Sequence, residues 1–330
     1  MVSKNLIFGL SLLCVSVFFD EVKGRRLSAV VQELLKLSDS FENDSINDRG
    51  QKQPDINNED LPNNGELFEG DIVMDENIRR AVLGYSNKKS ADINSKEGGF
   101  RHWKDGIVPY TFHKSLVPVI RERINDAIKE FNLLTCVRYV PKNEFDRDYV
   151  TFRSLTNGCS SSVGKQGGEQ FINLGIGCRK FGTVMHEMMH TIGIIHEQSR
   201  PDRNQYIDVL YDNIKPKLLH NFRMYSLRDA DNLDVPYNYW SVMHYNNFAF
   251  SSNGKKTLVS KLDKTLNFGQ RYQLTYLDVM QINKLYPGCQ QSKVDYSDAD
   301  FLVSNMTPHD VLKQKDEEAS DMLSLLASAE

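Results

Sequence analysis

One short stretch of the chain carries several side chains that can bind a metal ion. His186 and His190 are four residues apart, so on a helix their imidazoles lie on the same face, one turn from each other. Two imidazoles arranged in this way can bind the same tetrahedral ion, and Zn²⁺ is the usual one. Glu187 follows the first histidine, where such sites place a general base beside the water on the metal. The pattern predicts a zinc site with hydrolytic chemistry.

A third ligand is expected shortly after this helix. Gly193 has no Cβ and can adopt a positive φ, so it can end the helix and turn the chain back sharply. That turn would bring His196 to the same ion. Three protein ligands leave a fourth position open for water, which is typical of a catalytic zinc. Two histidines around a glutamate occur by chance in many helices, but Gly193 and His196 restrict the pattern at two further positions.

The residues that follow make the chain resemble the astacin family of zinc endopeptidases, a branch of the metzincins. The resemblance rests on Glu197, directly after the third histidine, and on the segment 241–245, which matches the Met-turn of the family with its tyrosine. It extends from about Trp103 to Cys289. Further matching residues are Gln198, Arg200, Asp202 and Arg203. Three residues depart from the usual family pattern but leave the ligand set intact: Thr191, Ile194 and Asn204.

The resemblance implies an α+β fold with two lobes. Above the cleft we expect a twisted mixed sheet and two helices, one of them the active-site helix, and below it irregular structure, the Met-turn and a C-terminal helix. By resemblance, a strand at 170–174 borders the cleft and pairs with an extended substrate. Hydrophobic spacing predicts strands at about 107–112, 137–140, 149–153 and 170–174, and helices at about 117–131, from 183 onward, at 214–223 and at 276–286, the last with Thr275 and Asp278 as a capping box.

Roles for individual residues of the site follow from this reading. Glu187 is the expected general base, which takes a proton from the attacking water and passes it to the leaving amine. By resemblance, the phenol of Tyr245 binds zinc in the resting enzyme and moves away to stabilise the transition state, although a purely structural tyrosine is the alternative. Met243 would pack beneath the metal without binding it. His244 is expected to be structural, and four histidines have no partner at ligand spacing: His102, His113, His220 and His309.

The N-terminus has the pattern of a secretory signal peptide. Lys4 precedes an apolar run from Leu6 to Phe19, and small residues follow at the cleavage positions. The run is short for a membrane span, so we expect no membrane anchor, and a buried N-terminal helix is the alternative. The predicted organisation is a signal peptide (1–24), a pro-segment with an inhibitory aspartate (25–93), an astacin-like catalytic domain (94–290) and an acidic flexible tail (291–330).

The tetrapeptide 68–71, Phe-Glu-Gly-Asp, stands out in the polar pro-segment. In the astacin family such an element blocks the zinc, so the resemblance implies that Asp71 is a metal ligand in the latent form only. A carboxylate is a competent zinc ligand, and its binding displaces the water. Without the family, the same tetrapeptide is an ordinary turn.

Maturation is expected to remove this pro-segment. The basic pairs Arg79-Arg80 and Lys88-Lys89 lie in a hydrophilic link that suits an activating trypsin-like protease, and cleavage between about Lys89 and Lys96 fits the family layout. The new α-amino group would then fold inward and pair with Glu197, because a buried carboxylate next to a zinc site needs a partner.

The cysteines fit an oxidising compartment. Cys14 would leave with the signal peptide, and the four that remain permit three pairings, between which the sequence alone does not choose. The resemblance implies the disulfides Cys136–Cys289 and Cys159–Cys178. Two sequons suggest possible glycosylation at Asn43 and Asn305. The tail has no cysteine and cannot form a disulfide-bonded EGF-like or CUB module.

Composition and motifs together favour a secreted enzyme. The net charge of −4 and the lack of a basic block argue against a nucleic-acid partner. We therefore expect a secreted, extracellular zinc endopeptidase with one Zn²⁺ per chain, made as a latent zymogen, with protein or peptide substrates in the extracellular space. The alternative is a zinc-containing protein of the same fold that binds peptides without cutting them, which Glu187 and the three histidines disfavour. Another metzincin branch is disfavoured by Glu197 and Tyr245.

Overall fold

The computed structural model describes residues 61–63, 65–83, 101–226 and 230–289, and the structural statements below concern these residues. All of them belong to one compact unit, Gly50–Ala299. The predicted signal peptide, the expected cleavage region, the acidic tail and both candidate glycosylation sites, Asn43 and Asn305, lie outside the described residues. The domain boundaries therefore stay predictions.

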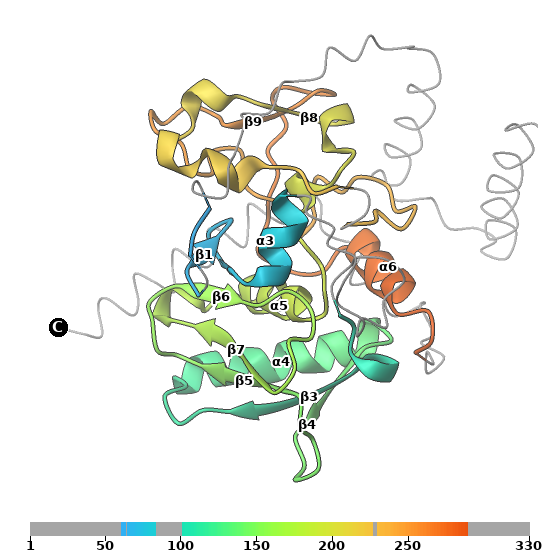
Figure 1. Cartoon of the computed structure of the whole chain (residues 1–330). Coiled ribbons are helices and arrows are strands. Elements are labelled where there is room, and N and C mark those ends of the chain that lie inside the picture. The colour runs from blue at the N-terminus through green and yellow to red at the C-terminus, as the bar shows by residue number, and fades with distance from the viewer. Residues whose placement is uncertain (1–60, 64, 84–100, 227–229, 290–330) are drawn as a thin grey trace, which may run out of the picture. The chain divides into compact units, whose positions relative to one another are not determined.

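A seven-stranded mixed sheet forms one part of this unit, mostly in the lower half of Figure 1. Neighbouring strands pair in parallel from β4 through β3 and β5 to β7, whereas β6 is antiparallel to β7. The last two strands, β1 and β2, come from the predicted pro-segment and extend the sheet beyond β6. In sheet order the strands are β1 (Leu67–Phe68), β2 (Ile72–Val73), β6 (Cys159–Ser161), β7 (Glu169–Leu174), β5 (Tyr149–Arg153), β3 (Ile107–Phe112) and β4 (Arg138–Pro141).

Two helices, α4 (Pro118–Leu134) and α5 (Phe181–Thr191), pack against one face of this sheet (Figure 1). Proline at the start of α4 supplies a helical φ where no intrahelical N–H is needed. The apolar residues of α4 recur every three or four positions. They are buried against alternate residues of the strands, which produces a continuous core. Members of this core include Ile124, Phe131, Val150, Phe152, Ile172 and Met185.

The other part of the unit, above the sheet in Figure 1, is mostly irregular. It contains a two-stranded antiparallel sheet of β8 (Ile207–Val209) and β9 (Leu258–Ser260), with its own apolar cluster. The helix expected at 214–223 is a 3₁₀ helix at Pro216–Phe222. The other 3₁₀ helices are Lys104–Gly106, Ile176–Cys178, Glu197–Ser199, Arg203–Gln205 and Tyr211–Asn213.

The C-terminal helix α6 (Tyr276–Leu285) packs into the core that α4 and α5 form with the sheet. Thr275 and Asp278 form the predicted capping box at its start. Cys289 is bonded to Cys136, next to β4, and a second disulfide joins Cys159 to Cys178. The predicted α+β class, with its mixed sheet and helices, is confirmed.

Two expectations about the sheet and the pro-segment were wrong. The strand expected to meet the substrate, now β7, is paired on one side with β5 and on the other with β6. Its main-chain groups are therefore used within the sheet, and β6 is the strand that borders the cleft. The expected hydrophilic link contains a helix, α3 (Glu76–Leu83), because Ile78, Ala81 and Val82 bury one of its faces. The basic pair Arg79-Arg80 lies within this helix.

Among the described residues, no helix is both long and apolar enough to cross a lipid bilayer.

We predict that Asp278→Ala lowers the free energy of unfolding by about 2–4 kcal/mol. The buried Asp278 carboxylate accepts hydrogen bonds from the Ser241 hydroxyl at 2.6 Å and from the Thr275 N–H at 2.9 Å, so its loss leaves buried donors unpaired and removes half of the capping box. Urea unfolding of the full chain measures the effect. Asp212→Ala removes an exposed carboxylate and should change stability by less than about 0.5 kcal/mol. Equal stability of Asp278→Ala and Asp212→Ala would contradict the stabilising role assigned to the Asp278 carboxylate.

Candidate metal centre

Helix α5 presents the first two candidate ligands. His186 and His190 lie one turn apart on it, are fully or almost fully buried, and have ring centroids 4.7 Å apart. The helix ends after Thr191, and Gly193 adopts a φ of 103°, a conformation that favours glycine. The chain turns back there and brings the buried His196 beside the other two rings, with centroids 5.1 Å from His186 and 4.7 Å from His190.

Each imidazole is oriented by a hydrogen bond at Nδ1. The Nδ1 of His186 lies 2.8 Å from the Val242 carbonyl oxygen, and that of His190 lies 2.8 Å from the Ile194 carbonyl oxygen. The Nδ1 of His196 lies 2.6 Å from a carboxylate oxygen of Glu69. Oxygen acceptors at these positions require Nδ1–H donors, so in each neutral imidazole Nε2 carries the lone pair. This is the tautomer that a metal ligand needs.

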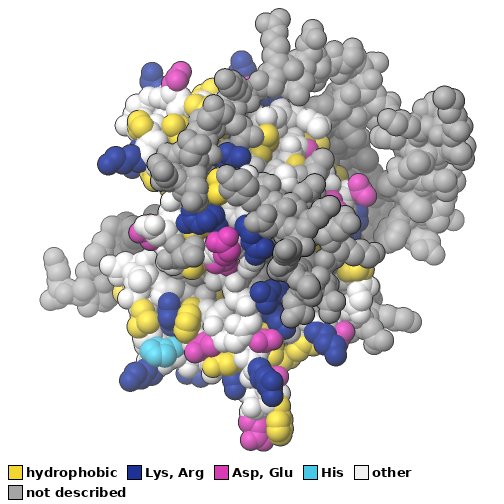
Figure 2. All heavy atoms as spheres, viewed as in Figure 1, with side chains coloured by type: hydrophobic (Ala, Val, Ile, Leu, Met, Phe, Trp, Pro, Cys, Tyr) yellow, Lys and Arg dark blue, Asp and Glu magenta, His cyan; other side chains and the backbone are white. Residues whose placement is uncertain are grey.

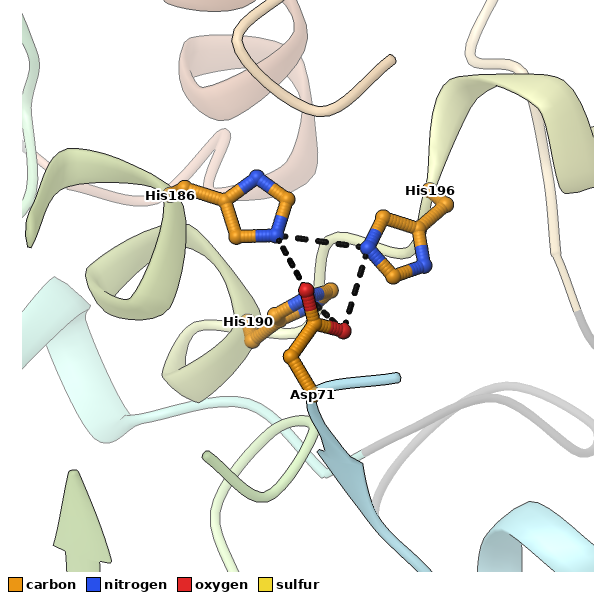
Figure 3. Close-up of side chains that lie close together, drawn as sticks. All are labelled: Asp71, His186, His190 and His196. Atoms are coloured by element: carbon orange, nitrogen blue, oxygen red, sulfur yellow. Dashed lines mark hydrogen bonds and ion pairs between the residues drawn. The ribbon is translucent and has the colours of Figure 1, made fainter. Parts of the chain in front are cut away.

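Asp71 completes the cluster (Figure 3). Its carboxylate oxygens lie 3.1 Å from Nε2 of His186, 3.2 Å from Nε2 of His196 and 3.6 Å from Nε2 of His190. The four side chains point toward one another, two from α5, one from the turn after it and one from the segment before β2 (Figure 3).

The donor set fits zinc. Ligand atoms at about 2.0–2.1 Å around a tetrahedral ion lie about 3.3–3.4 Å from each other. The Nε2 atoms of His186 and His196 are 3.2 Å apart, and the ligand atoms of all four residues lie within 4.8 Å of one another. Nε2 of His190 and Oδ1 of Asp71 are buried without a hydrogen-bond partner among the described residues, which is costly unless a cation lies between them.

Electrostatics also favour a cation at this point. Burial would raise the pKa of Asp71, but the surrounding imidazoles hold it well below its usual value. Burial lowers the pKa of His196, yet Asp71 and Glu69 together raise it to about 9. One carboxylate, Asp71, therefore faces all three rings and a second, Glu69, contacts His196, and a divalent ion would balance their charge.

Glu187 lies beside the cluster on α5. It is almost fully buried, and its Oε2 has no hydrogen-bond partner among the described residues. Burial, followed by the charge of Asp71, raises its pKa well above the usual value. Such a group is suited to accept a proton from a neighbouring water.

Glu69 is the site residue that sequence reasoning missed. Its buried carboxylate accepts the hydrogen bond from His196 described above and a second one from the Ser199 hydroxyl at 2.6 Å. Its N–H donates to Oδ1 of Asn221 at 2.8 Å, and its φ is +52°. The available signal was a carboxylate two residues before Asp71, but nothing in the sequence says that it contacts a zinc ligand.

The Met-turn tyrosine lies close to the predicted pro-segment. The phenol of Tyr245 donates a hydrogen bond to the Glu69 carbonyl oxygen, and its expected zinc contact in the resting enzyme stays a prediction. Val242 orients His186, and the fully buried Met243 belongs to the main apolar core. His244 is structural: its ring nitrogens contact the Tyr237 hydroxyl and the Tyr245 carbonyl oxygen, both at 2.7 Å.

Glu197 has partners within the described chain. Its carboxylate accepts hydrogen bonds from Arg200 at 3.0 Å and from the Asn238 N–H at 2.7 Å. Burial raises its pKa to about 7, and the neighbouring Arg200 charge opposes that shift. The predicted pairing of Glu197 with a new α-amino group lies outside this arrangement and stays a prediction.

The predicted pro-segment also binds the edge of the sheet. Ile72 pairs in parallel with Ser161 of β6, and the Ser161 N–H donates to the Asp71 carbonyl oxygen at 2.9 Å. The same short segment therefore contacts the metal centre with side chains and the cleft edge with its backbone.

Comparison with known proteins agrees with this geometry. Residues 95–287 match the model of the peptidase family described as Astacin, which is more than half of the chain. The chain belongs to the astacin family. As in other members of this family of zinc metalloendopeptidases, the metal of the astacin site is zinc.

Individual astacin relatives give the extent of the similarity. The chain is 42% identical over 247 residues to zinc metalloproteinase nas-14 of Caenorhabditis elegans, a match that covers 70% of this chain and 49% of that protein. It is 38% identical to nas-4 of the same organism, covering 69% of this chain and 71% of that protein. The matched region thus spans about half the length of the first of these astacins.

A solved astacin structure is also similar. High choriolytic enzyme 1, a hatching enzyme zinc-protease from medaka (Oryzias latipes), superposes with a TM-score of 0.53 and 30% sequence identity. The match covers 62% of this chain and 99% of that one.

We predict that His190→Ala loses zinc on dialysis, with an affinity lowered more than about a hundredfold, because a first-sphere ligand is removed. Metal analysis by atomic emission measures zinc per chain. His102→Ala, which replaces an exposed histidine outside the cluster, should keep the wild-type content. Full zinc retention in His190→Ala would argue against the assigned ligand set.

Proposed function

We propose that this chain is a secreted zinc endopeptidase made in a latent form and held inactive by the segment 67–73. The observation that carries the proposal is the position of Asp71, whose carboxylate lies within 3.1–3.6 Å of the Nε2 atoms of all three histidines. A carboxylate there occupies the coordination position that an active site keeps for water.

In the active form, zinc supplies Lewis acidity toward a peptide carbonyl and lowers the pKa of water. Glu187 accepts the proton of the attacking water at Oε2 and passes it to the leaving amine, which is the role of a general base and then of a general acid. Arg271 contributes a nearby positive charge that interacts with both Glu187 and Asp71. Its field would favour the ionised form of Glu187 once Asp71 has left.

Latency depends on three kinds of contact. Asp71 approaches the three ligand nitrogens, Glu69 accepts hydrogen bonds from His196 and Ser199, and β2 takes up the edge of β6. The carbonyl oxygen of Glu69 also accepts the hydrogen bond of Tyr245, so departure of the segment would free this phenol. In the mature protein Tyr245 would then turn to the zinc or to the reacting carbonyl.

Removal of the pro-segment would be performed by a trypsin-like protease. Cleavage between about Lys89 and Lys96 would create an α-amino group that folds inward toward Glu197. Substrates would be extracellular proteins or peptides bound in extended form along β6. Similarity to Meprin A subunit beta of Mus musculus, 33% identical over 73% of this chain and 32% of that protein, supports a peptidase of this kind.

The test is casein cleavage by the secreted protein before and after limited trypsin treatment, with and without a zinc chelator. Activity should appear after trypsin and disappear with the chelator. In the trypsin-treated protein, Glu187→Gln should keep its zinc and lose at least about 10²–10⁴-fold in kcat, because only the base is removed. Glu122→Gln, an exposed substitution on α4, serves as the matched control. Wild-type turnover in zinc-loaded Glu187→Gln would overturn the assignment of the base.

Asp71→Ala should make the uncleaved chain at least about tenfold more active on casein than the wild-type zymogen, because the position beside the three imidazoles becomes available to water. The initial rate of cleavage without trypsin measures the effect.

Asp75→Ala is the matched control. Asp75 belongs to the same segment, but its carboxylate accepts hydrogen bonds from the N–H groups of Asn77 and Ile78 at the start of α3. This variant should stay latent. If the two variants are equally latent, Asp71 is not the inhibitory ligand.

A further inference from the structure

A hollow of about 190 Å³ opens on the outer face of the sheet, beside the strand that borders the cleft. It is lined by residues of four adjacent strands and by the segment after β6. They include Val73 of β2, Ser160 of β6, Phe171 and Asn173 of β7, and Arg153 of β5.

The alternation of side chains along the strands explains this lining. Val150 and Phe152 of β5 and Ile172 of β7 lie in the core with α4 and α5. Arg153 and Phe171 are one residue out of step with them, so their side chains stand on the opposite face. The register pairs Arg153 with Asn173 and Asn173 with Ser160, which brings these polar residues side by side up to the edge strand.

Arg153 is held in place but lacks a full set of partners. Its guanidinium lies over the Phe171 ring, 3.7 Å from the ring centroid. Its Nε is buried and has no hydrogen-bond partner among the described residues. On the face shown in Figure 2, Lys and Arg side chains are interspersed with Asp and Glu and form no broad patch of one charge.

The pro-segment shows which chain positions reach the hollow. Ile72 pairs with Ser161, and the next residue, Val73, lines the hollow. Val73 is two positions after Asp71, which lies at the metal centre. A valine offers no acceptor to Arg153 and leaves the space beyond it unfilled. A longer side chain ending in a carboxylate would fill that space and bind the guanidinium.

We infer that this hollow is a specificity pocket for an acidic side chain, with Arg153 as the residue that binds its carboxylate. An extended substrate on β6 would place in the hollow a side chain two positions from the residue over the zinc. The pocket rests on the proposed peptidase function for its use with substrates, but its preference for a carboxylate is testable in the latent chain.

Glu169 lines the same hollow and is the one feature that opposes an acidic ligand. One of its carboxylate oxygens accepts a hydrogen bond from the Thr151 hydroxyl at 2.6 Å, which directs the group to β5. Removing this charge by Glu169→Gln should therefore increase the preference for an acidic side chain.

The first test uses position 73 of the full-length latent chain, without catalysis. Val73→Glu and Val73→Gln differ in charge but hardly in shape. We expect the melting temperature of Val73→Glu to exceed that of Val73→Gln by about 2–4 °C at low salt, since one charge-assisted hydrogen bond is added. In the Arg153→Gln background this difference in melting temperature should vanish. If Arg153→Gln does not fold, Arg153→Met takes its place in the same comparison. Equal melting temperatures of the two variants in the wild-type background would overturn the pocket.

The second test uses trypsin-activated protein and peptides with a single Glu or Gln at each position around the cleaved bond. One position should favour Glu by about three- to tenfold in kcat/KM, and Arg153→Gln should abolish that preference without affecting the other positions. Arg121→Gln is the matched control, because Arg121 also lies over a phenylalanine, Phe112, at 4.5 Å, on the β3 side of the sheet.

The outcomes separate the two proposals. Cleavage with no Glu preference at any position overturns the pocket and leaves the peptidase intact. No cleavage at all overturns the proposed function. The melting temperatures of the Val73 variants then still decide whether the hollow selects a carboxylate.

Discussion

The metal centre depends on the fixed tautomer of three imidazoles. An imidazole can offer only one lone pair at a time, so each Nδ1 must be held as a donor for Nε2 to face the ion. The three acceptors come from different parts of the chain: the Val242 carbonyl of the Met-turn, the Ile194 carbonyl after the glycine turn, and the Glu69 carboxylate. The Met-turn, the end of α5 and the predicted pro-segment must all be folded for this donor set to exist in the form described.

In the proposed zymogen, this constraint links latency to metal binding. The pro-segment contacts His196 at both ring nitrogens, through Glu69 at Nδ1 and through Asp71 at Nε2. It thereby stabilises the ligand that lies furthest from helix α5 in the chain while it occupies the remaining coordination position. When the segment leaves, His196 loses the carboxylate that orients it, and a new acceptor or a water must replace it. A zymogen built in this way protects its zinc while it blocks the chemistry.

The sequence predicted the centre better than its surroundings. His186, His190 and His196 are close in the chain, so helix geometry and one glycine suffice to bring them together. The amphipathic helix α4, the capping box of α6 and the strands β3 and β5 likewise follow from local periodicity. Glu69 and the enclosure of β7 could not be predicted in this way, because they depend on contacts between segments far apart in the sequence. Helix α3 was missed because its polar composition concealed three buried apolar residues.

In the proposed zymogen, the edge strand β6 explains how one segment can inhibit without resembling a good substrate. Because β7 is paired on both sides, a chain entering the cleft finds free main-chain groups on β6, and β2 takes them through Ile72. Main-chain pairing is tolerant of sequence, so it gives the pro-segment no advantage over a substrate. Its advantage comes from two carboxylates at the metal centre, whereas Val73 leaves the hollow beside Arg153 unused. If both proposals hold, inhibition and substrate selection use different side-chain sites along the same strand, and cleavage of the predicted pro-segment would release the first without altering the second.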